Sequence, residues 1–183
     1  MSEEEKLDLR TPEARSEVYG RLAQAFAYPE PGKQSLLSAV DYTEAFDPAA
    51  SKTACSVREY NYNKEMHSTN LNEELLRFYH FFGLSRAPDA LMPDHISIEL
   101  EFMQFLCTLE ANAAERGDDV LPIRKAQRDF IQRHVRRLVH GIAESFRADS
   151  EACLALVEMT VEVINADLHQ LVEELGLGSD QAA

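Results

Sequence analysis

Apolar residues recur three and four positions apart along most of the chain, and this spacing places side chains on one face of an α-helix. No segment shows the sustained alternation of apolar and polar residues that is typical of a half-buried strand. We therefore expect an all-α domain, a bundle of about six to eight helices. In chain order, the pattern predicts helices over residues 12–27, 33–40, 47–60, 70–82, 94–116, 118–146 (continuing through, or breaking near, Gly141) and 150–175.

Residue types that begin and end helices support several of these limits. Thr11 can cap the first helix, and Asn70 with Glu73 gives a capping-box pattern at the helix over 70–82. Residues 61–69 have no clear period, so we expect a loop there. Glycine follows three of the predicted helices, at positions 83, 117 and 176, where the backbone often becomes left-handed.

The composition fits one domain over residues 1–183, because 45% of the residues are apolar, which is enough for a core, while glycine and proline are scarce. We expect disorder over residues 1–10 and 177–183, and a hinge linker over residues 85–93. The first residues are acidic and polar, and no run reaches the roughly 18–20 apolar residues of a membrane span. We therefore expect neither a signal peptide nor membrane insertion.

Charge and cysteine content narrow the choice of partners and of compartment. Asp and Glu number 32 against 18 Lys and Arg, and the net charge is −14. Nucleic acid is not expected as a partner, because phosphate binding needs a basic face, whereas a basic partner would be attracted. Three cysteines without CxxC spacing favour a reducing compartment and no disulfides: Cys55, Cys107 and Cys153.

The segment LMPDHISIELEFM, residues 91–103, crowds polar residues at the entrance of a strongly apolar helix. Pro93 keeps the residue before it out of the helical conformation, and Asp94 is a good N-cap for the helix that follows. A histidine and two glutamates come within about two turns of this point. The candidate site residues of the segment are Pro93, Asp94, His95, Glu99 and Glu101.

His95 and Glu99 stand one helical turn apart and could share a metal ion, so a helical metal- or cofactor-binding protein is the alternative hypothesis. A di-iron bundle would need Glu-x-x-His pairs on two helices, and the sequence has no such set, so we expect no metal and no cofactor. Cys107 lies about three turns, roughly 18 Å, beyond His95, too far for a thiol–imidazole pair. Without a GxSxG motif or a phosphate-binding glycine loop, we expect no enzyme.

The aromatic run FYHFF, residues 78–82, is apolar on all sides. It belongs either to a fully buried helix or, in part, to one wall of a groove whose mouth holds Asp94, His95 and the nearby glutamates. A basic, apolar peptide would suit such a groove, through charge-assisted hydrogen bonds and burial together.

Four pieces of the chain resemble, in the right order, the TorD/DmsD/NarJ family of redox-enzyme maturation chaperones. The most specific piece is PDH followed by IxxELEFM. The resemblance is greatest to the branch that serves type II members of the dimethyl-sulfoxide-reductase family of molybdoenzymes. The pieces are EYN (59–61), ELLRFYHFFGLS (74–85), LMPDHISIELEFM (91–103) and RDFIQRHV (128–135).

This resemblance implies an all-helical, TorD-like chaperone of the cytoplasm and not an enzyme. Family members bind the twin-arginine signal peptide of a molybdopterin oxidoreductase catalytic subunit, and hold that subunit back from export until its cofactor is inserted. By position, residues 93–95 would form the hinge that contacts the peptide, with Glu99 and Glu101 beside it and Tyr60 in a second patch. The protein would be a monomer or a domain-swapped dimer, and some members also bind guanine nucleotide weakly.

The chain departs from the family pattern at one place. After Glu59 and Tyr60 the family continues with Leu-Phe and a Gly/Pro-rich loop, whereas this chain has Asn63, Lys64 and a short polar stretch. The loop is deleted or replaced. This difference affects the apolar half of the predicted peptide site and the role that the resemblance gives to Tyr60.

Overall fold

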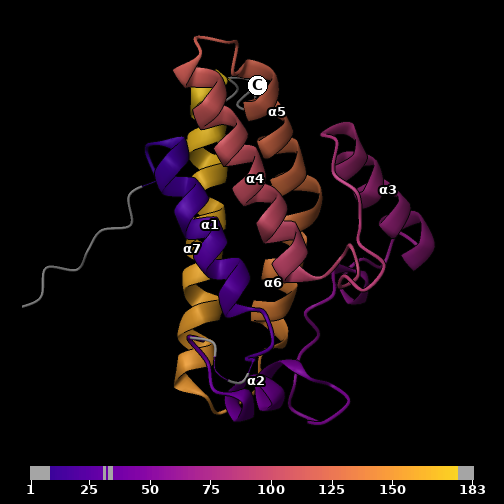
Figure 1. Ribbon diagram of the computed structural model, residues 1–183. Coiled ribbons are helices and arrows are strands. Elements are labelled where there is room, and N and C mark those ends of the chain that lie inside the picture. The colour runs from indigo at the N-terminus through magenta and orange to yellow at the C-terminus, as the bar shows by residue number, and fades with distance from the viewer. Residues whose placement is uncertain (1–8, 31, 33–34, 177–183) are drawn as a thin grey trace, which may run out of the picture.

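The computed structural model describes residues 9–30, 32 and 35–176, and the described chain is helical with no strand. The expected all-α fold is confirmed (Figure 1). Most of the ends expected to be disordered lie outside the described residues, and Leu9, the first described residue, is buried. The α-helices are α1 (Pro12–Ala25), α2 (Ala39–Phe46), α3 (Ser68–Phe81), α4 (Ile96–Glu115), α5 (Leu121–Phe130), α6 (Arg136–Ser145) and α7 (Glu151–Glu174).

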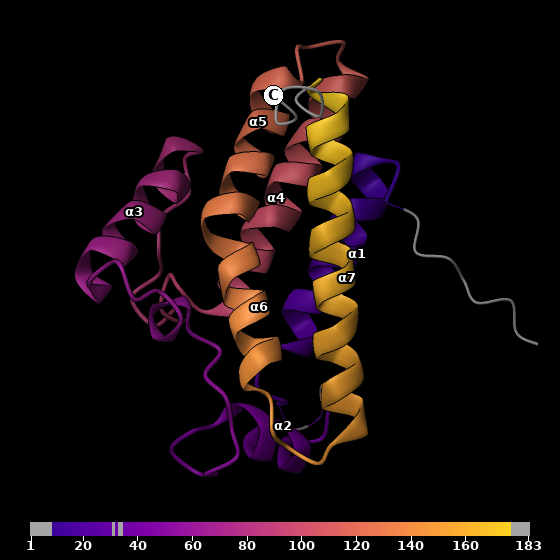
Figure 2. The ribbon, with the colours of Figure 1, turned by 180° about the vertical axis from the view of Figure 1, so that it is seen from behind.

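Four long helical rods form the body of the protein: α1, α4, α5 with α6, and α7 (Figures 1 and 2). They run roughly alongside one another, and α2 lies across one end of the bundle. Helix α3 stands at the side of the bundle, next to α4 and the α5–α6 rod, and is joined to α4 by residues 82–95. Helix α3 is thus a neighbour of α4 and lies outside the four packed rods.

Polar side chains begin several helices where the sequence predicts a start. The Thr11 hydroxyl oxygen accepts the N–H of Ala14 at 3.2 Å, and the Ser150 hydroxyl oxygen accepts that of Cys153 at 3.4 Å. Each of these bonds satisfies a backbone donor that lacks a partner within the helix. The predicted ends of α3, α4 and α7 are confirmed, because Gly83, Gly117 and Gly176 have φ of 77°, 72° and 68°.

Helices α5 and α6 form one rod, because the chain passes through Gly141 without a break. Between them lies a π-helical segment, Ile131–Val135, which carries His134. Gly141 is needed for packing, since a Cβ there would come within 2.3 Å of the Tyr62 ring. The helix predicted over 118–146 thus runs from Leu121 to Ser145, starting three residues later than predicted, and contains a π-helical turn, a feature often found at functional sites.

Two helices predicted between residues 33 and 60 are wrong. The first begins at Ala39, where Ser38 caps it, and not at residue 33, which lies outside the described residues. Residues 47–58 form no helix, and Glu59–Asn61 is a single 3-10 turn. The Asp47 carboxylate accepts the N–H of Ala49 at 3.0 Å, and a local bond of this kind competes with helix formation.

Helix α3 begins two residues earlier than predicted and is only partly buried. His67, and not Asn70, is its N-cap, since the His67 Nδ1 atom accepts the N–H of Thr69 at 3.4 Å. Leu71, Leu75 and Tyr79 are buried, whereas the ring of Phe81 is 83% exposed. The fully buried alternative for residues 78–82 is therefore wrong.

A buried polar network ties α1 to the rest of the bundle. The Arg15 guanidinium donates to Glu110 of α4 at 2.5 Å and to Asp167 of α7 at 3.1 Å. The Tyr19 hydroxyl donates to the other oxygen of Asp167 at 2.6 Å. The two carboxylates offset the buried positive charge of Arg15, while its Nε atom has no hydrogen-bond partner among the described residues. The three cysteines are free and buried, as expected of core residues: Cys55, Cys107 and Cys153.

Candidate functional site

The turn at residues 93–95 connects α4 to the segment around Glu59. The Asp94 carboxylate accepts a hydrogen bond from Arg58 Nε at 2.6 Å and a longer one from the backbone N–H of Tyr60 at 3.3 Å. The backbone N–H of Glu59 donates to the Asp94 carbonyl oxygen at 2.9 Å. Asp94 is 0% exposed, so its carboxylate contacts the segment around Glu59 and not the solvent.

The prediction that Asp94 caps α4 is wrong, because His95 is the N-cap. The His95 Nδ1 atom accepts the N–H of Ser97 at 3.2 Å. Burial, together with the nearby Arg58 guanidinium, lowers the pKa of His95 to about 4. The imidazole is therefore neutral at pH 7 and serves as a hydrogen-bond acceptor inside the turn.

Behind this turn lie two buried carboxyl groups with different partners. The Glu59 carboxylate pairs with His134 Nδ1 at 3.0 Å and with Arg137 at 3.0 Å. Glu99 is 0% exposed, and neither of its oxygens makes a hydrogen bond within the described part of the chain. Burial, and after it the nearby Glu59 carboxylate, raise the pKa of Glu99 well above its usual range, so the protonated form of Glu99 is favoured relative to that of an exposed glutamate.

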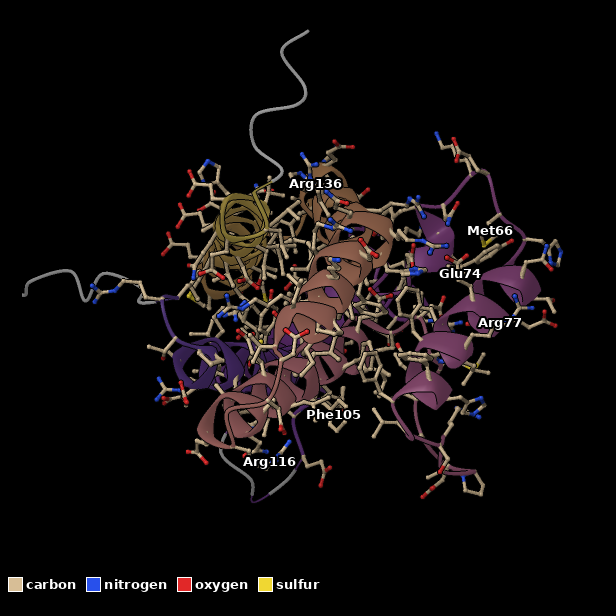
Figure 3. The ribbon with its side chains drawn as sticks, turned by 90° about the horizontal axis from the view of Figure 1, so that it is seen from above. Met66, Glu74, Arg77, Phe105, Arg116 and Arg136 are labelled. Carbon is tan, nitrogen blue, oxygen red and sulfur yellow. The ribbon has the colours of Figure 1, made fainter. Side chains whose placement is uncertain are left out.

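A groove runs between α3 and α4, beside the turn. The cavity has a volume of about 330 Å³, within the range of ligand sites. In Figure 3, Phe105 extends from α4 toward the side on which α3 lies. The lining is Leu76 and Tyr79 of α3; Leu84, Ser85, Arg86, Ala87, Ala90, Leu91 and Pro93 of the linker; and Ile98, Glu101, Phe102 and Phe105 of α4.

Aromatic contacts and ion pairs hold α3 in place across the groove. The Tyr79 ring packs on Phe102 with centroids 4.8 Å apart, and Phe82 packs on the same ring at 5.8 Å. Glu74, on the face of α3 toward the bundle in Figure 3, pairs with Arg133. The groove thus has an apolar floor and a wall fixed by several independent contacts.

Two side chains of the charged residue types line the groove, Arg86 and Glu101, and they differ in their partners. Arg86 donates to the carbonyl oxygens of Ala90 at 2.5 Å and Leu91 at 3.2 Å, which fixes the shape of the linker. Glu101 is solvent-accessible and makes no ion pair with any described residue. Partial burial raises the pKa of Glu101 above its ordinary value.

The apolar surface continues beyond the groove onto α3 and the linker. Phe81, Leu91 and Met92 are all exposed. The Phe81 ring contacts that of Phe82 at 5.1 Å, and Leu91 lines the groove itself. Exposed apolar residues gathered beside a cavity are typical of an interaction site.

Only two of the six candidate residues, Pro93 and Glu101, line this groove. Asp94, His95 and Glu99 lie behind it, buried. The Tyr60 side chain is 44% exposed and borders a different cavity, lined by residues 60, 61 and 63–67. The structure thus brings Tyr60 close to Asp94 through its backbone, while its ring lies apart from the groove.

Sequence patterns alone did not single out several groove residues. Ile98, Phe102 and Phe105 lie on one face of α4, at positions that repeat every three or four residues, with Glu101 between them. A glutamate within an otherwise apolar helix face, Glu101, is the sequence feature that could have identified these three residues. Leu76, Leu84 and Leu91 carried no distinguishing pattern.

Neither a metal centre nor a membrane span is found in the described part of the chain. No three His, Cys, Asp or Glu side chains there come together as ligands, so His95 and Glu99 lack a third. None of the described helices is both long and apolar enough to cross a bilayer. The metal-binding alternative therefore gains no support from the geometry.

The chain is similar in sequence to one protein family and to several known proteins. A family model described as nitrate reductase delta subunit matches residues 10–144. The chain is 30% identical over 178 residues to a selenate reductase assembly chaperone protein of Thauera selenatis, which covers 89% of this chain and 92% of that protein. It is 31% identical over 141 residues to a chlorate reductase assembly chaperone protein of Ideonella dechloratans, covering 68% and 72% of the two.

A third relative is a dimethyl sulfide dehydrogenase assembly chaperone protein of Rhodovulum sulfidophilum, 40% identical over 103 residues. That alignment covers 54% of this chain and 40% of the relative. All three relatives are named as assembly chaperones of redox enzymes.

Proposed function

Because the chain belongs to the nitrate reductase delta subunit family, we propose that it is an assembly chaperone for the catalytic subunit of a molybdenum-containing reductase. Family membership confirms the resemblance carried by residues 59–135, including its likeness to chaperones of type II reductases. The client is a molybdopterin oxidoreductase subunit. The chaperone holds that subunit in the cytoplasm until its cofactor is inserted.

The groove between α3 and α4 is the site at which this chaperone binds the client's twin-arginine signal peptide. Such a peptide combines an apolar segment with two cationic side chains. The observation that carries this proposal is the lining of the groove: apolar and aromatic side chains with one carboxylate, Glu101, that no described residue neutralises. Burial of the apolar segment supplies affinity, and the acidic chain attracts the cations.

The turn at residues 93–95 has a supporting part in this function. Tyr79 and Pro93 lie in the groove lining, and the buried bonds of Asp94 and His95 fix the turn on which Pro93 stands. The charge of −14 attracts a cationic peptide from a distance, and this attraction weakens with salt. The motif therefore acts by shaping the groove.

Calorimetric titration with a synthetic twin-arginine signal peptide of a type II reductase catalytic subunit tests the proposal. The control is the same peptide with both arginines changed to alanine. We expect micromolar or tighter binding, weakened in the control and at raised salt. No binding to any of a panel of such peptides would overturn the proposal.

A further inference from the structure

We propose that the Glu101 carboxylate binds the guanidinium of a single arginine of the peptide in the groove, and that Asp94, His95 and Glu99 do not touch the peptide. This inference deepens the proposed function and rests on it. It assigns unequal roles to the two arginines of the signal. One is bound in the groove, and the other lies outside it.

The first step is to ask which acidic groups a ligand can reach. Asp94 and Glu99 are each 0% exposed, and Asp94 already pairs with Arg58. Glu99 lies behind the turn, where its buried oxygens are out of reach of a ligand in the groove. Glu101 alone of the three has its carboxylate accessible in the groove lining.

The second step concerns the surroundings of Glu101. On α4 it lies between Ile98 and Phe105, one residue before Phe102, so its charge is flanked by apolar side chains. It has no cationic partner among the described residues, and partial burial disfavours its ionised form. A cation from the ligand would remove this cost and form a charge-assisted hydrogen bond.

The third step is the choice of arginine over lysine. Phe105 lies one turn beyond Glu101 on α4, lines the same cavity and is half-buried, whereas the nearly parallel ring of Phe102 is only 3% exposed. A planar guanidinium can pack against an aromatic face while it donates two hydrogen bonds to one carboxylate. An ammonium group is more strongly hydrated and cannot make this paired contact.

The fourth step concerns the number of arginines. Glu101 is the one acidic side chain in the lining of the groove. Arg86, in the same lining, keeps its positive charge while it donates to Ala90 and Leu91. A second guanidinium inside the groove would meet that charge without a carboxylate of its own. The second arginine therefore lies at the rim, where its contacts are exposed and weak.

The test is a double-mutant cycle measured by calorimetric titration. Wild-type protein and the Glu101→Gln variant are titrated with the twin-arginine peptide, and with peptides in which either arginine is replaced by neutral citrulline. We expect one citrulline peptide to bind wild type about ten- to a hundredfold more weakly, and the other to lose much less. Glu101→Gln should lose a similar amount with the native peptide, and nothing further with the sensitive citrulline peptide.

Two matched variants separate a contact from general charge. Glu115→Gln removes one negative charge from an exposed position at the end of α4, outside the groove, and Glu99→Gln changes the buried carboxyl. Both should bind the native peptide like wild type. A lysine peptide at the sensitive position should bind more weakly than the arginine peptide.

Native affinity in Glu101→Gln, or equal losses for both citrulline peptides with no coupling to Glu101, would overturn the inference while leaving the proposed function standing. Weaker binding in Glu99→Gln, with an unchanged circular dichroism spectrum, would also count against it. If wild type binds none of the peptides, the proposed function fails, and this inference falls with it.

Discussion

The Tyr79 hydroxyl donates a hydrogen bond to the carbonyl oxygen of Pro93 at 2.9 Å, and so ties α3 to the turn that begins α4. Both residues line the groove. The bond joins α3 to the end of the linker (residues 82–95) that lies next to α4. The position of α3 relative to α4 therefore depends on a direct bond as well as on aromatic packing.

Tyr79→Phe should lower the free energy of unfolding by about 1 kcal/mol, the usual net value of such a bond. It should also weaken peptide binding severalfold, because the groove loses one of its fixed points. The matched control is Tyr42→Phe, whose hydroxyl donates to the Phe26 carbonyl at 3.1 Å away from the groove. Urea denaturation and peptide titration should show similar stability losses and a binding loss in Tyr79→Phe alone.

Asp94→Ala should destabilise the protein by about 1.5–3 kcal/mol, the usual range for hydrogen bonds to a charged group. Arg58→Ala should cost a similar amount, and the double variant little more, because both changes remove the same bond. In these variants, peptide affinity should fall only to the extent that the turn at residues 93–95 is distorted. A large binding loss in Asp94→Ala with unchanged stability would mean that Asp94 touches the peptide, contrary to this account.

The raised pKa of Glu99 predicts a pH dependence of opposite sign to that of His95. Above the unfolded pKa of Glu99, the unfolded state releases a proton that the folded state keeps, so stability falls as pH rises, by up to about 1.4 kcal/mol per pH unit. The pKa of His95 is lowered to about 4, so its contribution is lost as pH falls from about 6.5.

Glu99→Gln isolates the first of these effects, because the His95 contribution is common to both proteins. The unfolding free energy of the variant minus that of wild type should rise in urea titrations as the pH increases above the ordinary pKa of glutamate, about 4.3. The exposed Glu162→Gln variant should show a constant difference. A flat difference for Glu99→Gln would mean that Glu99 is ionised in the folded protein.

Phe81→Ser tests whether the exposed apolar surface beside the groove takes part in binding. Because the ring is 83% exposed, its loss should change the unfolding free energy by no more than about 0.5 kcal/mol. Peptide affinity should fall about three- to tenfold as the buried apolar area shrinks. Val40→Ser, at a 75% exposed position on α2, is the matched control and should bind normally.

The sequence predicted those helix ends that depend on local chemistry. Thr11 and Ser150 cap helices, and Gly83 ends one, because each acts through its own backbone neighbours. Residues 47–58 do not form the predicted helix, because the backbone groups of Cys55, Val57 and Glu59 bond to Ala45, Ile96 and Asp94 in place of helical partners.

The groove could not be predicted from the spacing of apolar residues alone. Asp94 looks like an N-cap by residue type, and only its pairing with Arg58, 36 positions away, gives it another role. Likewise, the spacing of Ile98, Phe102 and Phe105 predicts a buried helix face. It cannot tell whether another helix covers that face or a cavity lies beside it.

The most direct test of the central claim is to fill the groove and measure peptide binding. Ala90 lines the groove and is partly buried, and Ala50 lines a shallow cavity beside α2. Ala90→Trp and Ala50→Trp therefore add the same bulk at two sites. Calorimetric titration with the twin-arginine peptide should show a loss of at least about tenfold in Ala90→Trp and native affinity in Ala50→Trp. Native affinity in a folded Ala90→Trp protein would contradict the account, because the peptide would then bind elsewhere.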